Sequence, residues 1–403
     1  MEKKNLLIAQ SGGPSAAINA TLAGVIAKAQ QSPEIGRILG SRHGIEGVLT
    51  ETYVDLTDFA DLERLKATPA MALGSCRFKL PADFTDPIYG RIEASLADME
   101  VGYFLYIGGN DSMDTVDKLS EYYAGRPGAP AVIGLPKTID NDLPGCDHTP
   151  GYGSAARYLA MTMEELIRDT AIYALPSVTI VEIMGRNAGW LTLAAGLPRL
   201  RGGQKPDFIA LPEVPFDEKD FLAKLRTRIR ESQNIIVAVS EGIRDLNGDY
   251  VGSNTKSGVL DSFGHLYLSG VGKYLEGLVK HEIGCKVRSI EVNLMQRCAG
   301  HAASQTDLEE AFAAGEFGVE MAVRGESGRM AVLLRREGEP YHFYCESVDV
   351  KACANGERLV PERWFDLEDA AVQKEICAYL LPLMKGDVPQ FRDEYGFADY
   401  VIF

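Results

Sequence analysis

Short apolar runs rich in β-branched residues alternate with longer amphipathic stretches along most of the chain. This alternation is typical of a parallel sheet covered by helices, so the predicted fold class is α/β. The runs predicted to be strands are residues 5–9, 37–39, 103–107, 131–135, 178–182, 207–211, 235–239, 287–292 and 330–334. Helices are predicted to begin near Ser15, Asp111, Gly153, Asn187, Phe216, Gly264 and Thr306, several of them capped by Ser, Asp, Asn or Thr side chains.

Polar segments follow several of these runs directly. They read SGGPS at 11–15, GGNDS at 108–112, PKTIDND at 136–142, MGRNAG at 184–189, SEGIRD at 240–245 and MQR at 295–297. Ligands bind outside the carboxyl ends of strands in open parallel sheets, so we expect these segments to line a common crevice. We expect two doubly wound, mainly parallel α/β domains, residues 1–150 and 151–295, with the crevice between them. Residues 296–403 are expected to be a return segment and a C-terminal extension, which the pattern does not assign.

Composition narrows the class of protein. Hydrophobic residues make up 46% and charged residues 24% of the 403, and no stretch approaches the roughly 18 apolar residues of a membrane helix. The 41 basic and 57 acidic residues give a net charge of −16, which repels polyanions and predicts no nucleic-acid partner. The 7 cysteines have no CxxC spacing, and no export signal is visible, so we expect reduced thiols and a cytoplasmic location.

Two glycine turns, at 11–15 and 108–112, each precede a predicted helix. Such turns expose backbone N–H groups and the positive helix end to a phosphate. Glycines also form tight turns that bind nothing, so either motif alone leaves both interpretations open. The chain has no GxxxxGK[ST] motif, which excludes an NTPase P-loop as the phosphate cradle.

Charged side chains near the predicted crevice supply candidate chemistry. In the loop at 136–142, a carboxylate could accept a proton from a hydroxyl and Lys137 could neutralise a phosphoryl group, although such residues also form ordinary turns. Glu241 could accept hydrogen bonds from a sugar hydroxyl. Each of four arginines is a candidate to bind two phosphate oxygens at once through its guanidinium group: Arg77, Arg186, Arg288 and Arg297.

Taken in order, GGPSAAIN, GSCRF, GGNDS, PKTIDND, MGR, SEG and QR resemble the phosphofructokinase family over roughly residues 5–310. The resemblance implies a phosphoryl-donor site in residues 1–150, a fructose 6-phosphate site in 151–295, Mg²⁺ as cofactor, and a homodimer or homotetramer. ATP-using members carry glycine at the positions of Asp111 and Lys137, whereas pyrophosphate-using members carry aspartate and lysine. The resemblance therefore implies pyrophosphate as donor, and the Asp111 carboxylate would also crowd the α-phosphate of ATP.

The resemblance also implies roles for individual residues. Asp140 is expected to be the general base on the sugar 1-hydroxyl, and Lys137 and Asp111 are the other expected catalytic residues. Pyrophosphate is expected to contact Gly12, Gly13, Arg77 and Lys137, and Mg²⁺ to contact Asn110 and Asp111. Fructose 6-phosphate is expected to contact Thr138, Asp140, Met184, Gly185, Arg186, Glu241 and Arg297, and Arg288 from a neighbouring subunit.

The expected reaction is reversible transfer from pyrophosphate to fructose 6-phosphate, a step of glycolysis and gluconeogenesis. Two other enzyme hypotheses stay open: the same donor with sedoheptulose 7-phosphate as acceptor, and ATP as donor. A fourth hypothesis is a non-catalytic regulatory subunit, because Asn110 stands where most of the family has a magnesium-binding aspartate. The presence of Asp140 and Lys137 argues against that fourth hypothesis.

Overall fold

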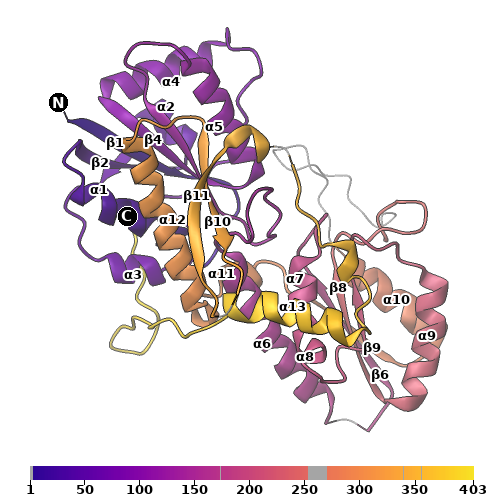
Figure 1. The fold of residues 1–403 in the computed structure, drawn as a ribbon. Helices are drawn as coiled ribbons and strands as arrows, with labels where there is room; N and C mark the ends of the chain where they lie inside the picture. The colour runs from indigo at the N-terminus through magenta and orange to yellow at the C-terminus, as the bar shows by residue number, and fades with distance from the viewer. Residues whose placement is uncertain (1–2, 173, 253–269, 339, 355) are drawn as a thin grey trace.

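The structure, a computed structural model, describes residues 3–172, 174–252, 270–338, 340–354 and 356–403. These residues form two lobes, each built on one sheet (Figure 1). The first sheet has the order β11-β10-β5-β4-β1-β2-β3, and its pairs are parallel except β2 with β3 and β10 with β11. Its strands are β1 Lys4–Gln10, β2 Ile35–Ser41, β3 Tyr53–Asp55, β4 Val101–Gly108, β5 Ala131–Pro136, β10 Arg329–Arg335 and β11 Phe343–Asp349.

The second sheet has the order β7-β8-β6-β9 and is parallel throughout. Its strands are β6 Ser177–Ile183, β7 Phe208–Ala210, β8 Asn234–Ser240 and β9 Lys286–Glu291. The central strands β6 and β8 are buried along nearly their whole length, which explains their continuous apolar sequence. The strand β9 lies at the edge of the sheet and is partly exposed.

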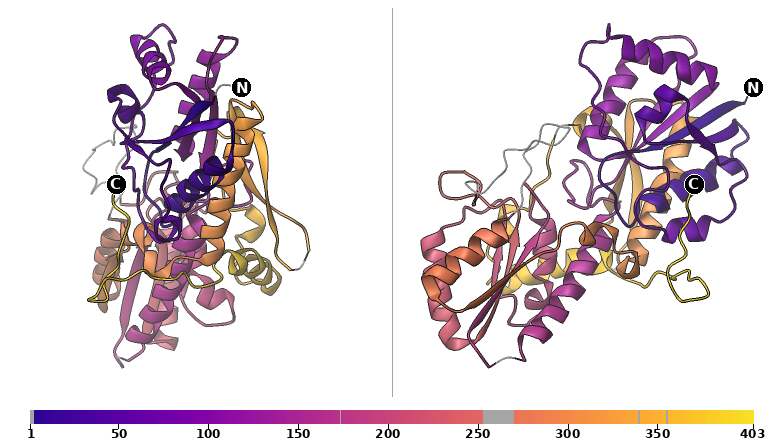
Figure 2. Two further views of the ribbon diagram at one scale, coloured as in Figure 1. Left: turned by 90° about the vertical axis from the view of Figure 1, so that its left-hand side faces the viewer. Right: turned by 180° about the vertical axis from the view of Figure 1, so that it is seen from behind.

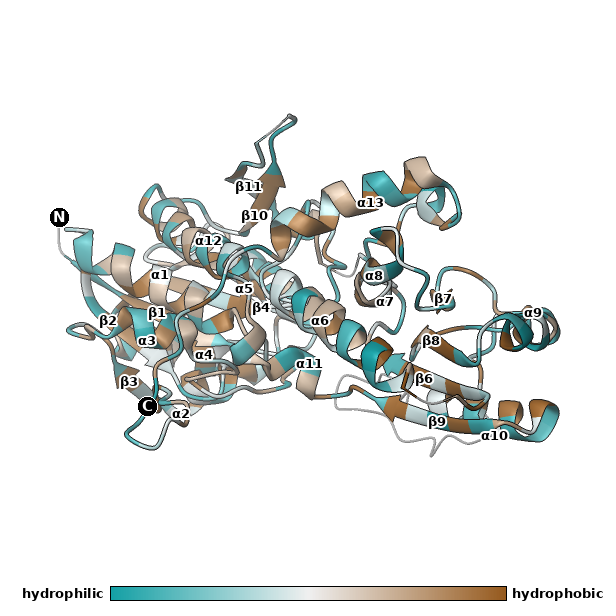
Figure 3. Ribbon diagram, turned by 90° about the horizontal axis from the view of Figure 1, so that it is seen from below, coloured by the Kyte–Doolittle hydropathy of each residue, from teal (hydrophilic) through white to brown (hydrophobic). Residues whose placement is uncertain are grey.

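Helices cover the sheets of both lobes, as two further views show (Figure 2). They are α1 Ile18–Gln31, α2 Ile45–Thr50, α3 Leu62–Ala67, α4 Pro87–Asp98, α5 Asn110–Tyr123, α6 Tyr152–Thr170, α7 Trp190–Ala195, α8 Leu197–Leu200, α9 Glu218–Glu231, α10 Val271–Ile283, α11 Met295–Cys298, α12 Gln305–Val323 and α13 Ala370–Leu383. Hydrophobic and hydrophilic residues alternate along α6, α9 and α10, as expected for helices with one face on a sheet (Figure 3). None of the helices in the described ranges combines the length and the apolar character needed to cross a bilayer.

The predicted α/β class is confirmed, and each predicted strand overlaps an observed one. The sequence analysis missed β3 and β11, whose residues are largely exposed or half-exposed and form no apolar run. The predicted helix starts match α1, α5, α6, α7, α9 and α12 to within three residues, and the start predicted near Gly264 lies outside the described residues. Side chains cap two of these helices, α9 by Asp217 and α12 by Ser304, whereas α5 begins after Gly109 without a side-chain cap.

The chain after residue 295 contributes to both lobes. In the first lobe, α12 packs on α1, where Lys28 Nζ lies 2.5 Å from Glu320 Oε1, and β10 and β11 extend the sheet. In the second lobe, α13 shares a hydrophobic core with α6, α7 and α8. Figure 1 shows α13 lying along the second lobe, with one end at the junction of the lobes. The predicted domain boundaries at 150 and 295 stay predictions.

Candidate active site

A cavity of about 600 Å³ opens at the carboxyl ends of strands from both sheets. In the first sheet the chain order reverses between β1 and β4, and such a switch point is where open α/β sheets bind ligands. The loops after β1, β4, β5, β6 and β8 all reach the cavity. The predicted site residues that line it are Gly12, Gly13, Arg77, Asn110, Asp111, Lys137, Thr138, Asp140, Met184, Arg186, Glu241 and Arg297.

The glycine turn after β1 lies against two cationic side chains. A Cβ on Gly12 would lie 3.4 Å from Lys137 Nζ, and a Cβ on Gly13 would lie 3.4 Å from an Arg297 guanidinium nitrogen. Gly12 has a φ of +80°, a conformation that residues with a Cβ rarely adopt. The turn therefore brings backbone close to two positive charges, an arrangement suited to a small polyanion.

The loop after β5 carries an ammonium group and two carboxyl groups with perturbed titration. Burial lowers the pKa of Lys137 to about 8, although the carboxyl group of Asp140 opposes that shift. Burial raises the pKa of Asp140, against the influence of Lys137 and the nearby arginines. Burial and the neighbouring Asp140 raise the pKa of Asp142 to about 7. Perturbed groups gathered in one cavity are typical of functional sites, and a base with a raised pKa is better matched to proton transfer near neutral pH.

Hydrogen bonds fix the start of this loop. The Lys137 N–H donates to the Gly108 carbonyl at 2.9 Å, which joins the loop after β5 to the end of β4. The Asp140 N–H donates to Thr138 Oγ1 at 3.1 Å, and Thr149 Oγ1 donates to the Thr138 carbonyl at 2.8 Å. Asp140 is therefore held on a short turn with its backbone oriented by Thr138.

The second lobe presents an arginine and a carboxyl group to the cavity. The Gly185 N–H donates to Glu241 Oε1 at 3.4 Å, and the Met184 N–H donates to Gln296 Oε1 at 3.3 Å. Burial, together with Asp140, raises the pKa of Glu241 to about 8. Arg186 Nε is buried and has no hydrogen-bond partner within the described part of the chain. An unpaired guanidinium N–H at a cavity wall fits an anionic or hydroxyl-bearing ligand.

The first turn of α5 fits a magnesium ion. Asn110 Oδ1 is buried and has no hydrogen-bond partner among the residues that the structure describes, and Asp111 lies beside it at the cavity. Carboxylate and amide oxygens are ligands that Mg²⁺ accepts, usually with waters and substrate phosphates completing its shell. The described ranges contain no cluster of three or more His, Cys, Asp or Glu that could hold a metal by themselves. A metal at Asn110 and Asp111 would therefore take further oxygens from a bound ligand or from water.

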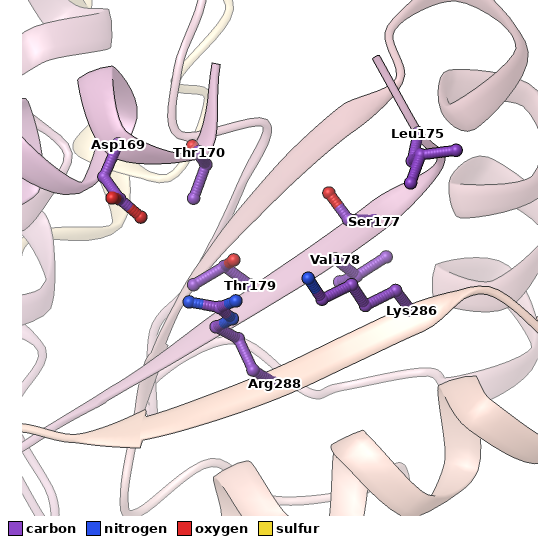
Figure 4. A pocket seen from close by; sticks show the side chains of 8 residues that line it. All are labelled: Asp169, Thr170, Leu175, Ser177, Val178, Thr179, Lys286 and Arg288. Atoms are coloured by element: carbon purple, nitrogen blue, oxygen red, sulfur yellow. The ribbon is translucent and has the colours of Figure 1, made fainter. Parts of the chain in front are cut away.

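Two of the predicted site residues do not line this cavity. Gly185 is not among the lining residues, but its N–H donates to Glu241, which is. Arg288 lies on β9 and lines a separate pocket with Ser177, Thr179 and Lys286 (Figure 4). Within one chain, therefore, the structure does not bring Arg288 to the other site residues.

The sequence analysis missed the lining residue Glu357, and it gave no binding role to Asn187, which lies in the segment 184–189 expected at the crevice. Asn187 Nδ2 donates to Glu357 Oε1 at 2.6 Å, so the two side chains form one part of the cavity wall. The position of Asn187 after β6 is the signal that placed it in that segment. Glu357 comes from the C-terminal region, where no strand or motif precedes it to mark it as a site residue.

Comparisons with known proteins agree on one family. The family model described as Phosphofructokinase matches residues 5–322. A pyrophosphate–fructose 6-phosphate 1-phosphotransferase of Xanthomonas campestris pv. campestris (strain B100) is 40% identical over 407 residues, which cover 100% of this chain and 96% of the relative. The protein of that name from Halomonas elongata is 36% identical, with 98% of this chain and 95% of the relative covered.

A solved structure agrees with the sequence relatives. The crystal structure of a pyrophosphate-dependent phosphofructokinase from Nitrosospira multiformis has a TM-score of 0.85 and 35% identity to this chain. The similarity covers 99% of this chain and 96% of that one, so it includes both lobes and the C-terminal return. Together with the family match over residues 5–322, this establishes that the chain belongs to the phosphofructokinase family.

Proposed function

We propose that this protein transfers a phosphoryl group from pyrophosphate to fructose 6-phosphate, giving fructose 1,6-bisphosphate and phosphate. The observation that carries the proposal is the single cavity in which Asp111 and Lys137 face the same space as Asp140, Arg186 and Glu241. The names of the full-length relatives support the same donor and acceptor. Because pyrophosphate and the sugar bisphosphate are both phosphoryl donors, the proposed reaction runs in either direction.

In the proposed reaction, Asp140 accepts the proton of the sugar 1-hydroxyl. The hydroxyl oxygen forms a bond to the distal phosphorus of pyrophosphate, and the bond from that phosphorus to the bridging oxygen breaks. The bridging oxygen leaves with the other phosphorus as inorganic phosphate. Lys137 offsets negative charge on the transferred group, so that the residues act mainly by position and electrostatics.

The proposed donor contacts are Gly12, Gly13, Arg77 and Lys137, and the proposed acceptor contacts are Thr138, Met184, Arg186, Glu241 and Arg297. Asn110 and Asp111 would hold Mg²⁺, which when bound would neutralise charge on the donor oxygens. The Asp111 carboxylate disfavours ATP because it places negative charge where an α-phosphate would run. The ammonium group of Lys137 suits the small, highly charged pyrophosphate.

The proposal includes a homodimer or homotetramer and a cytoplasmic location. Arg288 could reach the 6-phosphate only from a neighbouring chain, because it lies outside the cavity of its own chain. All seven cysteines are free thiols, in keeping with a reducing compartment. Measurement of the molar mass of the protein in solution tests the proposed oligomeric state.

Coupled turnover by the purified full chain tests the proposal. Fructose 6-phosphate and sedoheptulose 7-phosphate are each offered with Mg²⁺ and either pyrophosphate or ATP. The expected result is turnover of fructose 6-phosphate with pyrophosphate and not with ATP. Turnover with ATP alone would overturn the proposed donor, and preference for the longer sugar would overturn the proposed acceptor. Absence of turnover in every combination would favour the regulatory subunit.

A further inference from the structure

The C-terminal region forms hydrogen bonds with the loop that carries Asp140. The family match ends at residue 322, whereas Arg358 and Tyr379 come later in the chain and contact this loop. Tyr379 lies on α13, and one end of this helix is at the junction of the two lobes (Figure 1). Neither residue is among those that line the cavity, and both form hydrogen bonds to this loop.

The contacts converge on Asn141, which lies between the two cavity carboxylates. Asn141 is fully buried and has a φ of +57°. Its side-chain N–H donates to Tyr379 Oη at 2.8 Å, its Oδ1 accepts the Thr149 N–H at 3.1 Å, and its carbonyl accepts from the Arg358 guanidinium at 3.2 Å. Residues other than glycine seldom adopt the left-handed conformation, and it persists where the surroundings over-determine it.

The hydroxyl of Tyr379 has all its hydrogen-bonding capacity used at this point. It accepts from Asn141 and from the Arg358 guanidinium, at 3.3 Å for the latter, and it donates to the Asp147 carbonyl at 2.7 Å. The phenol therefore ties together both ends of residues 141–147. Because a hydroxyl offers one donor and two acceptor positions, all three positions are occupied by protein groups.

Arg358 contributes through its backbone as well as its side chain. Its N–H donates to the Asp142 carbonyl at 2.7 Å, and its carbonyl accepts from Trp190 Nε1 at 2.9 Å. Its guanidinium carbon lies 4.1 Å from the centre of the Trp190 ring. Trp190 begins α7 in the second lobe, so Arg358 connects the loop of the first lobe to the core of the second.

We propose that Arg358 and Tyr379 are positioning residues that fix Asp140 and Asp142 by holding Asn141 in its left-handed conformation. The proposal deepens the proposed function, and its turnover readout rests on it. Loss of the Tyr379 hydroxyl frees the Asn141 side chain, and the backbone on either side of it can then leave the observed conformation. A base displaced by a fraction of an ångström slows proton transfer more than it weakens sugar binding.

The test uses Tyr379→Phe in the full-length protein, with Tyr89→Phe as the matched control. Tyr89 is also fully buried, and its hydroxyl donates to the Pro81 carbonyl at 2.5 Å, away from the loop. We expect kcat to fall by roughly tenfold in Tyr379→Phe, with KM for fructose 6-phosphate changed by less than about threefold. The control is expected to keep the kcat of the unmodified protein. Equal kcat values in both variants would overturn the proposal.

A double-mutant cycle separates positioning from a general loss of stability. Asn141→Gly tolerates the positive φ but lacks the amide that binds Tyr379. We expect Asn141→Gly and Tyr379→Phe each to lower kcat, and their combination to lower it no further than the larger single effect, because both act through one contact. Multiplicative losses in the double variant would overturn the proposed route through Asn141.

Amide hydrogen exchange supplies a readout that needs no turnover. We expect peptides covering residues 137–149 to exchange faster in Tyr379→Phe than in Tyr89→Phe. Unchanged exchange in that segment would overturn the inference even if the proposed reaction is correct. If the unmodified protein turns over neither donor, the proposed function fails, and faster exchange confined to this segment still supports the hold of Tyr379 on the loop.

Discussion

Gly12 and Lys137 approach so closely that a Cβ on Gly12 would lie 3.4 Å from Lys137 Nζ. The contact joins the turn after β1 to the loop after β5. Their strands lie on either side of β4 in the sheet, so the two segments meet across the end of β4. A small anion held by backbone N–H groups of the turn would therefore lie next to the ammonium group. The φ of +80° at Gly12 makes this approach dependent on glycine.

Gly12→Ala is expected to raise KM for pyrophosphate by roughly tenfold, because an alanine at positive φ strains the turn and narrows the space beside Lys137. Steady-state kinetics with varied pyrophosphate measures the effect. Gly90→Ala is the matched control, since Gly90 lies exposed in α4 with no atom within 4 Å of its added Cβ. An unchanged KM for pyrophosphate in Gly12→Ala would show that the turn is not part of the donor site.

Asp140→Asn is expected to lower kcat by about 10² to 10⁴, the usual contribution of a general base, because the amide cannot accept the hydroxyl proton. The side chain keeps its size, so KM for fructose 6-phosphate should change by only a few-fold. Coupled turnover at saturating pyrophosphate measures both constants. A loss below about fivefold in kcat would contradict the assignment of Asp140 as the base.

The paired replacement Asp111→Gly with Lys137→Gly is expected to abolish most turnover with pyrophosphate. It removes the cation proposed to bind the donor and the carboxylate proposed to exclude ATP, and both residues line the cavity. Turnover is compared with each donor at equal Mg²⁺. If the pair leaves the ratio of the two rates unchanged, these residues do not choose the donor.

The affinity for pyrophosphate is expected to fall as the pH rises past about 8. Burial lowers the pKa of Lys137 to about 8, so the ammonium group is charged below that pH and neutral above it. KM for pyrophosphate should therefore rise between pH 8 and 9.5 and stay level between pH 6.5 and 7.5. In Lys137→Arg, which keeps its charge across this range, any remaining turnover should lack that rise. A rise of equal size in both proteins would assign it to another group.

We expect His148 to make the stability of the fold depend on pH. Burial alone would lower its pKa, but Glu310 and Asp147, whose carboxylate oxygens lie 2.7 Å from its two ring nitrogens, outweigh burial and raise the pKa to about 9. The folded protein then holds a proton that the unfolded chain releases near its ordinary pKa of 6.5. Its contribution is fully present below pH 6.5 and is lost as the pH rises through about 9.

Between those values the free energy of unfolding should fall by up to about 1.4 kcal/mol per pH unit from this group. Urea unfolding at several pH values measures the slope. In His148→Gln the slope between pH 6.5 and 9 should shrink, because glutamine does not titrate. An equal slope in the variant would show that another group causes the dependence.

Local pattern was enough to predict most of the fold. Apolar runs of strand length mark β1, β4, β5, β6 and β8 because these strands are buried on both faces. The short β3 and the partly exposed β11 carry no such run, and β11 belongs to the sheet only through its pairing with β10. Their membership of the sheet depends on tertiary contacts.

For the site, the order of the residues shows which segments follow the strands, and parallel strands of one sheet necessarily end at the same edge. It could therefore indicate Asp111, which follows β4, and Lys137 and Asp140, which follow β5, as neighbours in a crevice. Arg186 follows β6 of the other sheet, so its place beside them depends on how the two lobes pack. Three features came from the packing of distant segments. Arg288 lies outside this cavity, Glu357 reaches it from the C-terminal region, and Tyr379 binds the loop that carries Asp140. The physical reason is separation along the chain: Asn141 and Tyr379 are 238 residues apart, and no local periodicity encodes a hydrogen bond between them.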